Sequence, residues 1–101
     1  MPSSYDSHLR SATAIALTGS NQQAVTGAAI FMGLVVTDEA AANIKVHIHN
    51  GTDNTGEHVA ALGVSSNGQA QEWFAPNGVA CPDGIFVDVV SGTPSGSIFY
   101  R

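Results

Sequence analysis

Apolar and polar side chains alternate along residues 44–49, which read IKVHIH. Successive side chains of a strand point to opposite faces of a sheet, so the apolar residues lie on one face and Lys45, His47 and His49 on the other. Residues 50–56 (NGTDNTG) follow, and they are rich in Asn, Gly and Asp, which tolerate positive φ. We therefore expect a half-buried strand, a chain reversal and an antiparallel return strand, and hence an all-β fold.

Several other segments have the length and residue types of strands, and clusters of Gly, Pro, Asn, Asp and Ser separate them. The predicted strands are residues 12–17, 28–37, 43–49, 57–64, 70–75, 85–90 and 96–101. Residues 38–42 are too few for a stable helix, which favours a loop. The spacing predicts a single-domain antiparallel β-sandwich of 7–8 short strands, jelly-roll-like, over residues 12–101. Residues 1–11 are predicted to form a polar N-terminal arm.

Some of these strands carry large apolar side chains at both parities. In residues 30–36 (IFMGLVV), strict alternation places Phe31 and Val35 opposite the other large residues, and neighbours such as Trp73 and Phe74 must also point apart. Leaving a large apolar side chain exposed forfeits roughly 1.5–3 kcal/mol, which favours an interface over the second face. The alternative is that loops and the arm cover this face within one chain. We predict a homo-oligomer, a trimer rather than a dimer, whose interface includes Phe31, Val35, Trp73, Phe86 and Tyr100.

Composition narrows the possible partners. Charged residues make up 11% of the chain, well below the roughly 25% usual for soluble domains, which indicates a neutral surface. The net charge of −5 disfavours nucleic acid as a partner, because binding phosphates needs clustered Lys and Arg. No segment has the apolar run of a signal peptide or a membrane span, so we expect folding in the cytoplasm and no membrane partner. Cys81 is the single cysteine, which excludes an intrachain disulfide.

Histidines supply the main concentration of ligand chemistry. His47 and His49 are two residues apart on one strand face, and His58 begins the returning strand, with Asp53 and Glu57 nearby in sequence. Three converging imidazoles are able to bind Zn²⁺ or Ni²⁺. A histidine pair on a strand is nevertheless common on solvated faces, so we interpret these residues as exposed polar positions and predict neither a metal nor a cofactor. At an oligomer axis they would instead make assembly sensitive to pH near 6.

Catalytic motifs are missing from the sequence. It has no G-x-S-x-G, no phosphate-binding glycine loop before a helix and no paired carboxylates at a useful spacing. Cys81 is expected to be a small buried residue, and we predict that the protein is not an enzyme. Trp73, the single tryptophan, favours a core or interface position because it lies in mid-strand, although an exposed Trp would also suit stacking on a sugar ring.

The strand and turn pattern of residues 31–36, 44–52, 73–79, 82–92 and 96–100 resembles small β-sandwich structural proteins of tailed bacteriophages, the type that decorates or cements the capsid. The resemblance implies a non-enzymatic virion component on the outer capsid surface, made in the host cytoplasm, with the major capsid protein as its partner. A tail or fibre attachment module with possible glycan binding is the alternative that it implies.

A clamping mechanism follows from this resemblance. A small oligomer with docking arms would grip several sites of a capsid shell at once, so that avidity replaces strong single contacts. We hypothesise that Tyr5, His8, Leu9 and Arg10 order against the major capsid protein, with Arg10 meeting an acidic partner. Unchanged capsid occupancy after deletion of residues 2–10 would exclude this hypothesis.

Overall fold

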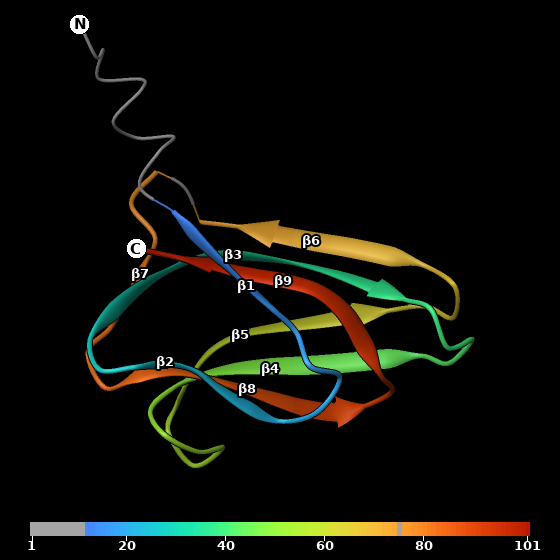
Figure 1. Ribbon diagram of the computed structural model, residues 1–101, viewed down its shortest axis with the longest axis horizontal. Helices are drawn as coiled ribbons and strands as arrows, with labels where there is room; N and C mark the ends of the chain where they lie inside the picture. Colours follow the sequence, from blue (N-terminus) through green and yellow to red (C-terminus); the bar gives the residue numbers. More distant parts are fainter. Residues whose placement is uncertain (1–11, 75) are drawn as a thin grey trace, which may run out of the picture.

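Two antiparallel sheets pack face to face in the computed structural model, which describes residues 12–74 and 76–101 (Figure 1). The five-stranded sheet contains β1 (Thr13–Ala16), β9 (Pro94–Tyr100), β3 (Ala29–Asp38), β6 (Gln69–Trp73) and β7 (Val79–Cys81), which pairs with β3. The four-stranded sheet contains, in order, β2 (Gln22–Thr26), β8 (Gly84–Ser91), β4 (Ile44–Asn50) and β5 (Glu57–Val64). The predicted all-β sandwich is confirmed.

The order of the strands is that of a jelly roll. β4 pairs with β5, β3 with β6, β2 with β8 and β1 with β9, all antiparallel. These pairs are nested around the β4–β5 turn, so the chain is one long folded hairpin wound into two sheets. The short β7 lies outside this nesting. Sequential pairs alternate between the sheets, so both sheets are built from the whole length of the chain.

The core fills the space between the sheets. Val46 and Ile48 of β4 are fully buried, as their alternation with polar residues predicted, and they face side chains of the five-stranded sheet. The largest fully buried side chains come from both layers and are Phe31, Leu34, Val36, Val46, Ile48, Ile85, Val87 and Ile98, together with Cys81. Cys81 is the small buried residue that was predicted, and its burial raises the pKa of the thiol.

Strict alternation gave the wrong face for Phe31. The pairing of β3 with β9 shifts register between Phe31 and Gly33, as in a β-bulge. A bulge adds one residue to a strand and thereby reverses the parity beyond it. Phe31 therefore enters the same core as Leu34 and Val36, with its ring centroid 5.8 Å from that of Phe74. The prediction of Phe31 as an interface residue is corrected: it is fully buried within one chain.

Two strands were not predicted. β2 (QQAVT) is mostly polar and lies at the edge of its sheet, where one strand partner suffices and apolar alternation is not required. β7 has three residues, too few for a periodic signal. The last strand begins at Pro94, inside the predicted turn of residues 92–95, whereas the bounds Glu57–Val64 of β5 were predicted correctly.

The link from β3 to β4 is the expected loop, organised by the buried Asp38 carboxylate. Asp38 accepts hydrogen bonds from the backbone N–H groups of Asn67 at 2.6 Å, Ala40 at 3.0 Å and Ala42 at 2.9 Å. The bonds from Asn67 and Ala40, with that from Ala42, hold the pKa of Asp38 below its ordinary value. The Asp38 carboxylate thus joins two segments. One is the β3–β4 loop, by which the chain crosses from one sheet to the other, and the second is the turn after β5.

Candidate functional site

The outer faces of the two sheets are the candidate functional surfaces, because their side chains are not needed for the core. Cross-strand partners share a face, so the register defines each surface. We call the outer face of the five-stranded sheet the neutral face, and its residues are Ala14, Ala16, Gly33, Val35, Thr37, Gln69, Gln71, Trp73, Ser95, Ser97 and Phe99. We call the outer face of the four-stranded sheet the histidine face, formed by Lys45, His47, His49, His58, Ala61, Gly63, Phe86 and Asp88.

An aromatic pair occupies the neutral face. Trp73 is 48% exposed, and its ring centroid lies 4.9 Å from that of Phe99. Between them in the register is Gly33, where an added Cβ would come within 2.5 Å of the indole ring, so the missing side chain lets Trp73 lie flat on the strand. The indole Nε1 donates a hydrogen bond to Gln71 Oε1 at 2.7 Å, which fixes the ring.

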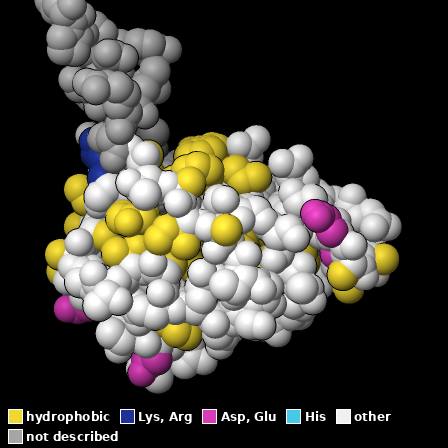
Figure 2. Space-filling view, viewed as in Figure 1, with side chains coloured by type: hydrophobic (Ala, Val, Ile, Leu, Met, Phe, Trp, Pro, Cys, Tyr) yellow, Lys and Arg dark blue, Asp and Glu magenta, His cyan; other side chains and the backbone are white. Residues whose placement is uncertain are grey.

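None of the residues that define the neutral face carries a charge. Figure 2, viewed as in Figure 1, shows hydrophobic side chains gathered near β6 and β1, with acidic side chains lying apart from them. Hydroxyl and amide groups from Ser97 and Gln71 flank the aromatic pair through the same register. The surface is thus aromatic and uncharged, which matches the neutral surface expected from composition.

The residues predicted for an interface separate in the fold. Val35 and Trp73 share the neutral face, but Phe86 lies on the histidine face, paired with His49. Tyr100 is half-buried against the core, because it has the opposite parity to Phe99. The predicted interface set contained Tyr100 and not its neighbour Phe99, since alternation alone does not say which parity faces inward.

One part of the outer face of β3 is covered within the chain. An added Cβ at Gly78 would lie 2.5 Å from Ile30 Cγ2 and 2.7 Å from Met32 Sδ, so the turn before β7 packs directly on these side chains. The guanidinium of Arg101 donates to the carbonyl oxygen of Pro76 at 3.1 Å and holds this turn. The alternative of coverage by loops therefore applies at this end of β3, whereas Trp73 is half-exposed in the described part of the chain.

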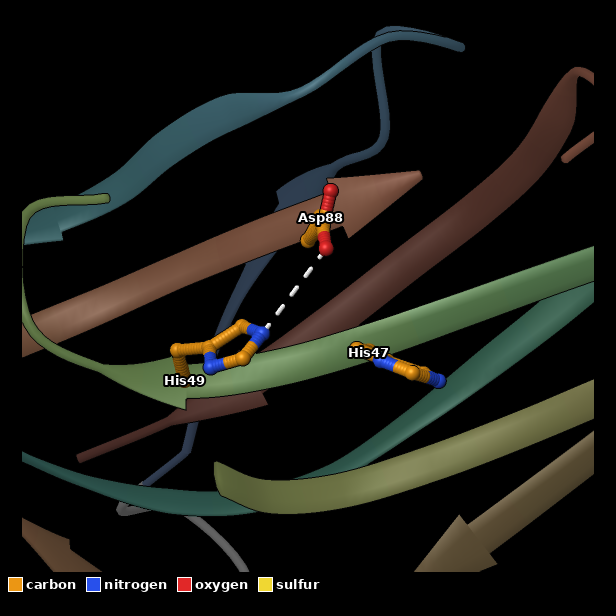
Figure 3. Close-up of side chains that lie close together, drawn as sticks. All are labelled: His47, His49 and Asp88. Atoms are coloured by element: carbon orange, nitrogen blue, oxygen red, sulfur yellow. Dashed lines mark ion pairs between the residues drawn. The ribbon is translucent and has the colours of Figure 1, made fainter. Parts of the chain in front are cut away.

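On the histidine face, three imidazoles and one carboxylate gather. The ring centroids of His47 and His58 lie 4.8 Å apart, and those of His49 and His58 lie 5.4 Å apart. The predicted histidine cluster does assemble, and β8 adds Asp88, the register partner of His47. Ligand atoms of His47, His49 and Asp88 all lie within 4.8 Å of one another (Figure 3). Sequence reasoning missed Asp88 because the β4–β8 pairing is distant in the chain.

The carboxylates that the sequence placed near the histidines do not join this group. Asp53 is exposed, and hydrogen bonds from the side chain and backbone of Thr55 lower its pKa. Glu57 is also exposed, at the start of β5. These side chains have no part in the set of His47, His49 and Asp88.

The capsid-docking residues of our hypothesis, Tyr5, His8, Leu9 and Arg10, lie outside the described residues. Within residues 12–74 and 76–101, the surface has no pocket, and no helix is long and apolar enough to cross a membrane. Comparisons with known protein families, curated proteins and solved structures found no match for this chain.

Proposed function

We propose that the protein is a non-enzymatic structural protein that self-associates through the neutral face. Following the resemblance of its strand pattern, we further propose that it decorates a virus capsid and clamps the major capsid protein on the outer shell. The observation that carries the proposal is the exposed Trp73–Phe99 pair on an uncharged sheet surface.

The chemistry of the neutral face favours burial against a protein. Trp is the residue most typical of strong interface contacts, and it contributes most when neighbours exclude water around it. An interface on this face would desolvate no charged side chain of the defined set, so the main cost of burying polar surface is avoided. Gln71, Ser95 and Ser97 offer hydrogen-bonding groups at its margins.

A second copy of this chain is the occupant that the proposal assigns to the neutral face. A closed trimer, which remains the proposed state, joins two different patches of each copy, so the neutral face of one copy would pack against another part of its neighbour. Jelly-roll sandwiches occur in viral capsid domains, which agrees with the proposal at the level of fold analogy. In a decorated shell, an oligomer would present several docking segments together and bind by avidity.

A matched pair of charge insertions tests self-association. Val35→Glu places a carboxylate in the neutral face, and Ala61→Glu places the same group at an exposed position of the histidine face. Because an unpaired charge is costly to bury, sedimentation velocity should show oligomers for the natural chain and Ala61→Glu, but monomers for Val35→Glu. A natural chain that stays monomeric at every accessible concentration would refute the proposal.

Capsid decoration is tested separately with shells assembled from the major capsid protein. We expect the natural chain to bind shells in many regularly placed copies, visible by cryo-electron microscopy, and Val35→Glu to bind weakly because avidity is lost. Oligomers that never bind shells would leave self-association standing and exclude decoration.

Glycan binding in a tail or fibre module is the second candidate, and the exposure of Trp73 favours it. An exposed indole flanked by Gln71 is able to stack on a sugar ring while the amide binds hydroxyl groups. Saturable quenching of Trp73 fluorescence by a polysaccharide, together with loss of binding to the same polysaccharide in Trp73→Ala, would support this candidate. An unchanged spectrum across a glycan panel would favour the structural role.

A further inference from the structure

We propose that His47, His49 and Asp88 form a binding site for a divalent transition-metal ion of the Zn²⁺ type on the histidine face. The inference is independent of the proposed function, because the two outer faces lie on opposite sides of the sandwich. It rests on the orientation of His49, the register of β4 and β8, and the distances between the ligand atoms.

His49 is held in the form that a metal ligand requires. Its Nδ1 lies 3.0 Å from the carbonyl oxygen of Gly56, and a carbonyl only accepts, so Nδ1 carries the proton. A backbone carbonyl bound to the second ring nitrogen is the usual support of a metal-bound histidine. The other nitrogen, Nε2, is then left with a free electron pair directed away from Gly56.

That electron pair has no hydrogen-bond partner. Nε2 is buried without one in the described structure, and the side chain of His49 is only 8% exposed. Nε2 lies 3.8 Å from Asp88 Oδ2, so an electron pair faces a carboxylate, which is unfavourable unless a positive charge stands between them (Figure 3). A proton on Nε2 or a metal ion is able to supply this charge, and the other residues distinguish the two.

The position of His47 favours a metal ion over a proton. A proton shared between His49 and Asp88 needs no third ligand, whereas His47, the register partner of Asp88, places a third ligand atom within 4.8 Å of both. Two imidazole nitrogens and a carboxylate oxygen suit Zn²⁺, which bonds such atoms at about 2.0–2.2 Å. Tetrahedral binding brings ligand atoms to about 3.3 Å from one another. The side chains of His47 and Asp88 would therefore have to rotate toward Nε2 of His49, whose ring is held by Gly56.

His58 is exposed and contributes no atom to the ligand group, although its ring contacts that of His47. It therefore serves as a matched control, since it is an imidazole of the same cluster that the proposed site does not use.

The test is calorimetric titration of the full chain with Zn²⁺. We expect binding of one ion per chain, weakened by about tenfold or more in Asp88→Asn and in His47→Gln, because each loses a ligand. His58→Gln should retain affinity within about threefold, since that change removes an imidazole and leaves the ligands in place. Thermal unfolding without metal identifies any variant that fails to fold.

Nitrogen NMR of the histidine rings gives a second readout that does not depend on a variant. Zn²⁺ should shift the Nε2 resonance of His49 while its Nδ1 keeps the proton bound to Gly56. No heat of binding and no shift at His49 would overturn the proposal and assign the charge between His49 and Asp88 to a proton. Equal binding by the natural chain and Asp88→Asn, with loss in His58→Gln, would also overturn the assigned ligand set.

Discussion

The neutral face and the histidine face are built by the same strand geometry but carry opposite chemistry. Both faces cover one shared core. They differ in their outward-facing side chains, which come from β3, β6 and β9 on the neutral face and from β4, β5 and β8 on the histidine face. One set presents Trp73 and Phe99 without a charge, and the other gathers titratable side chains. The positions that the core does not constrain are therefore the ones in which the two faces differ.

The contrast begins in the two central strands. β4 alternates strictly, so its outer face is polar and its histidines are free to serve a site. β3 is apolar at both parities, so Val35 remains as an apolar outer residue after the core and the turn before β7 have covered its neighbours. We infer that β3 serves two contacts, one inside the chain and one outside it.

The largest expected effect separates inner from outer aromatic residues. Phe31→Ala should lower the free energy of unfolding by about 3–5 kcal/mol, because it leaves a cavity in the core. Trp73→Ala should lower it by no more than about 1.5 kcal/mol in the monomer, since it removes a half-exposed ring and its contact with Phe99. Urea unfolding at low protein concentration measures both. Equal losses would contradict the placement of these rings on opposite sides of the sheet.

An intermediate effect compares one glycine from each face. Gly33→Ala places a Cβ against the Trp73 ring and should destabilise the fold by about 1–3 kcal/mol while displacing the indole. Gly63→Ala is the matched control on the histidine face, where the nearest atom to an added Cβ is 4.0 Å away. That change should be neutral or slightly stabilising, because Ala reduces the freedom of the unfolded chain. Urea unfolding measures stability, and tryptophan fluorescence reports the displacement.

The smallest expected effect is on the stability of the fold at acidic pH. Asp38 is the last residue of β3, where the chain leaves one sheet for the other, and its pKa is lowered in the folded protein. Its contribution to stability is therefore fully present above the unfolded pKa of about 4 and is lost as the pH falls through the folded pKa. In Asp38→Asn this part of the acid dependence should disappear, and stability at neutral pH should also fall. Unfolding midpoints measured from pH 7 downward test this. An unchanged pH profile would contradict the assigned role of Asp38.

The local residue pattern predicted much of this fold, but it did not predict which face of every strand is buried. The alternation of β4 gave its faces directly, and turn residues gave the bounds of β5. The bulge at Phe31 follows from pairing with β9, a strand more than sixty residues away, and has no local signal. The polar β2 is a strand because β8 offers it an edge, not because of its own residues.

Residues of the candidate sites were also predictable only where they lie close together in the sequence. The three histidines are neighbours along one hairpin, so the sequence brought them together, whereas Asp88 joins them through a strand pairing that only the fold defines. Trp73, from the predicted interface set, lies on the neutral face. Its partner Phe99 was not in that set, because the parity of β9 depends on its neighbours.

Solvent access to the Trp73 indole shows whether a second copy covers the neutral face, since the single tryptophan gives a unique signal. In NMR with a soluble paramagnetic probe, we expect the indole N–H of the natural chain to be protected despite the exposure of Trp73 in one chain. The amide of Gly63 on the histidine face should be strongly relaxed, and Val35→Glu should expose the indole as well. An indole relaxed as strongly as Gly63 in the natural chain would contradict the claim that the neutral face is covered by a second copy.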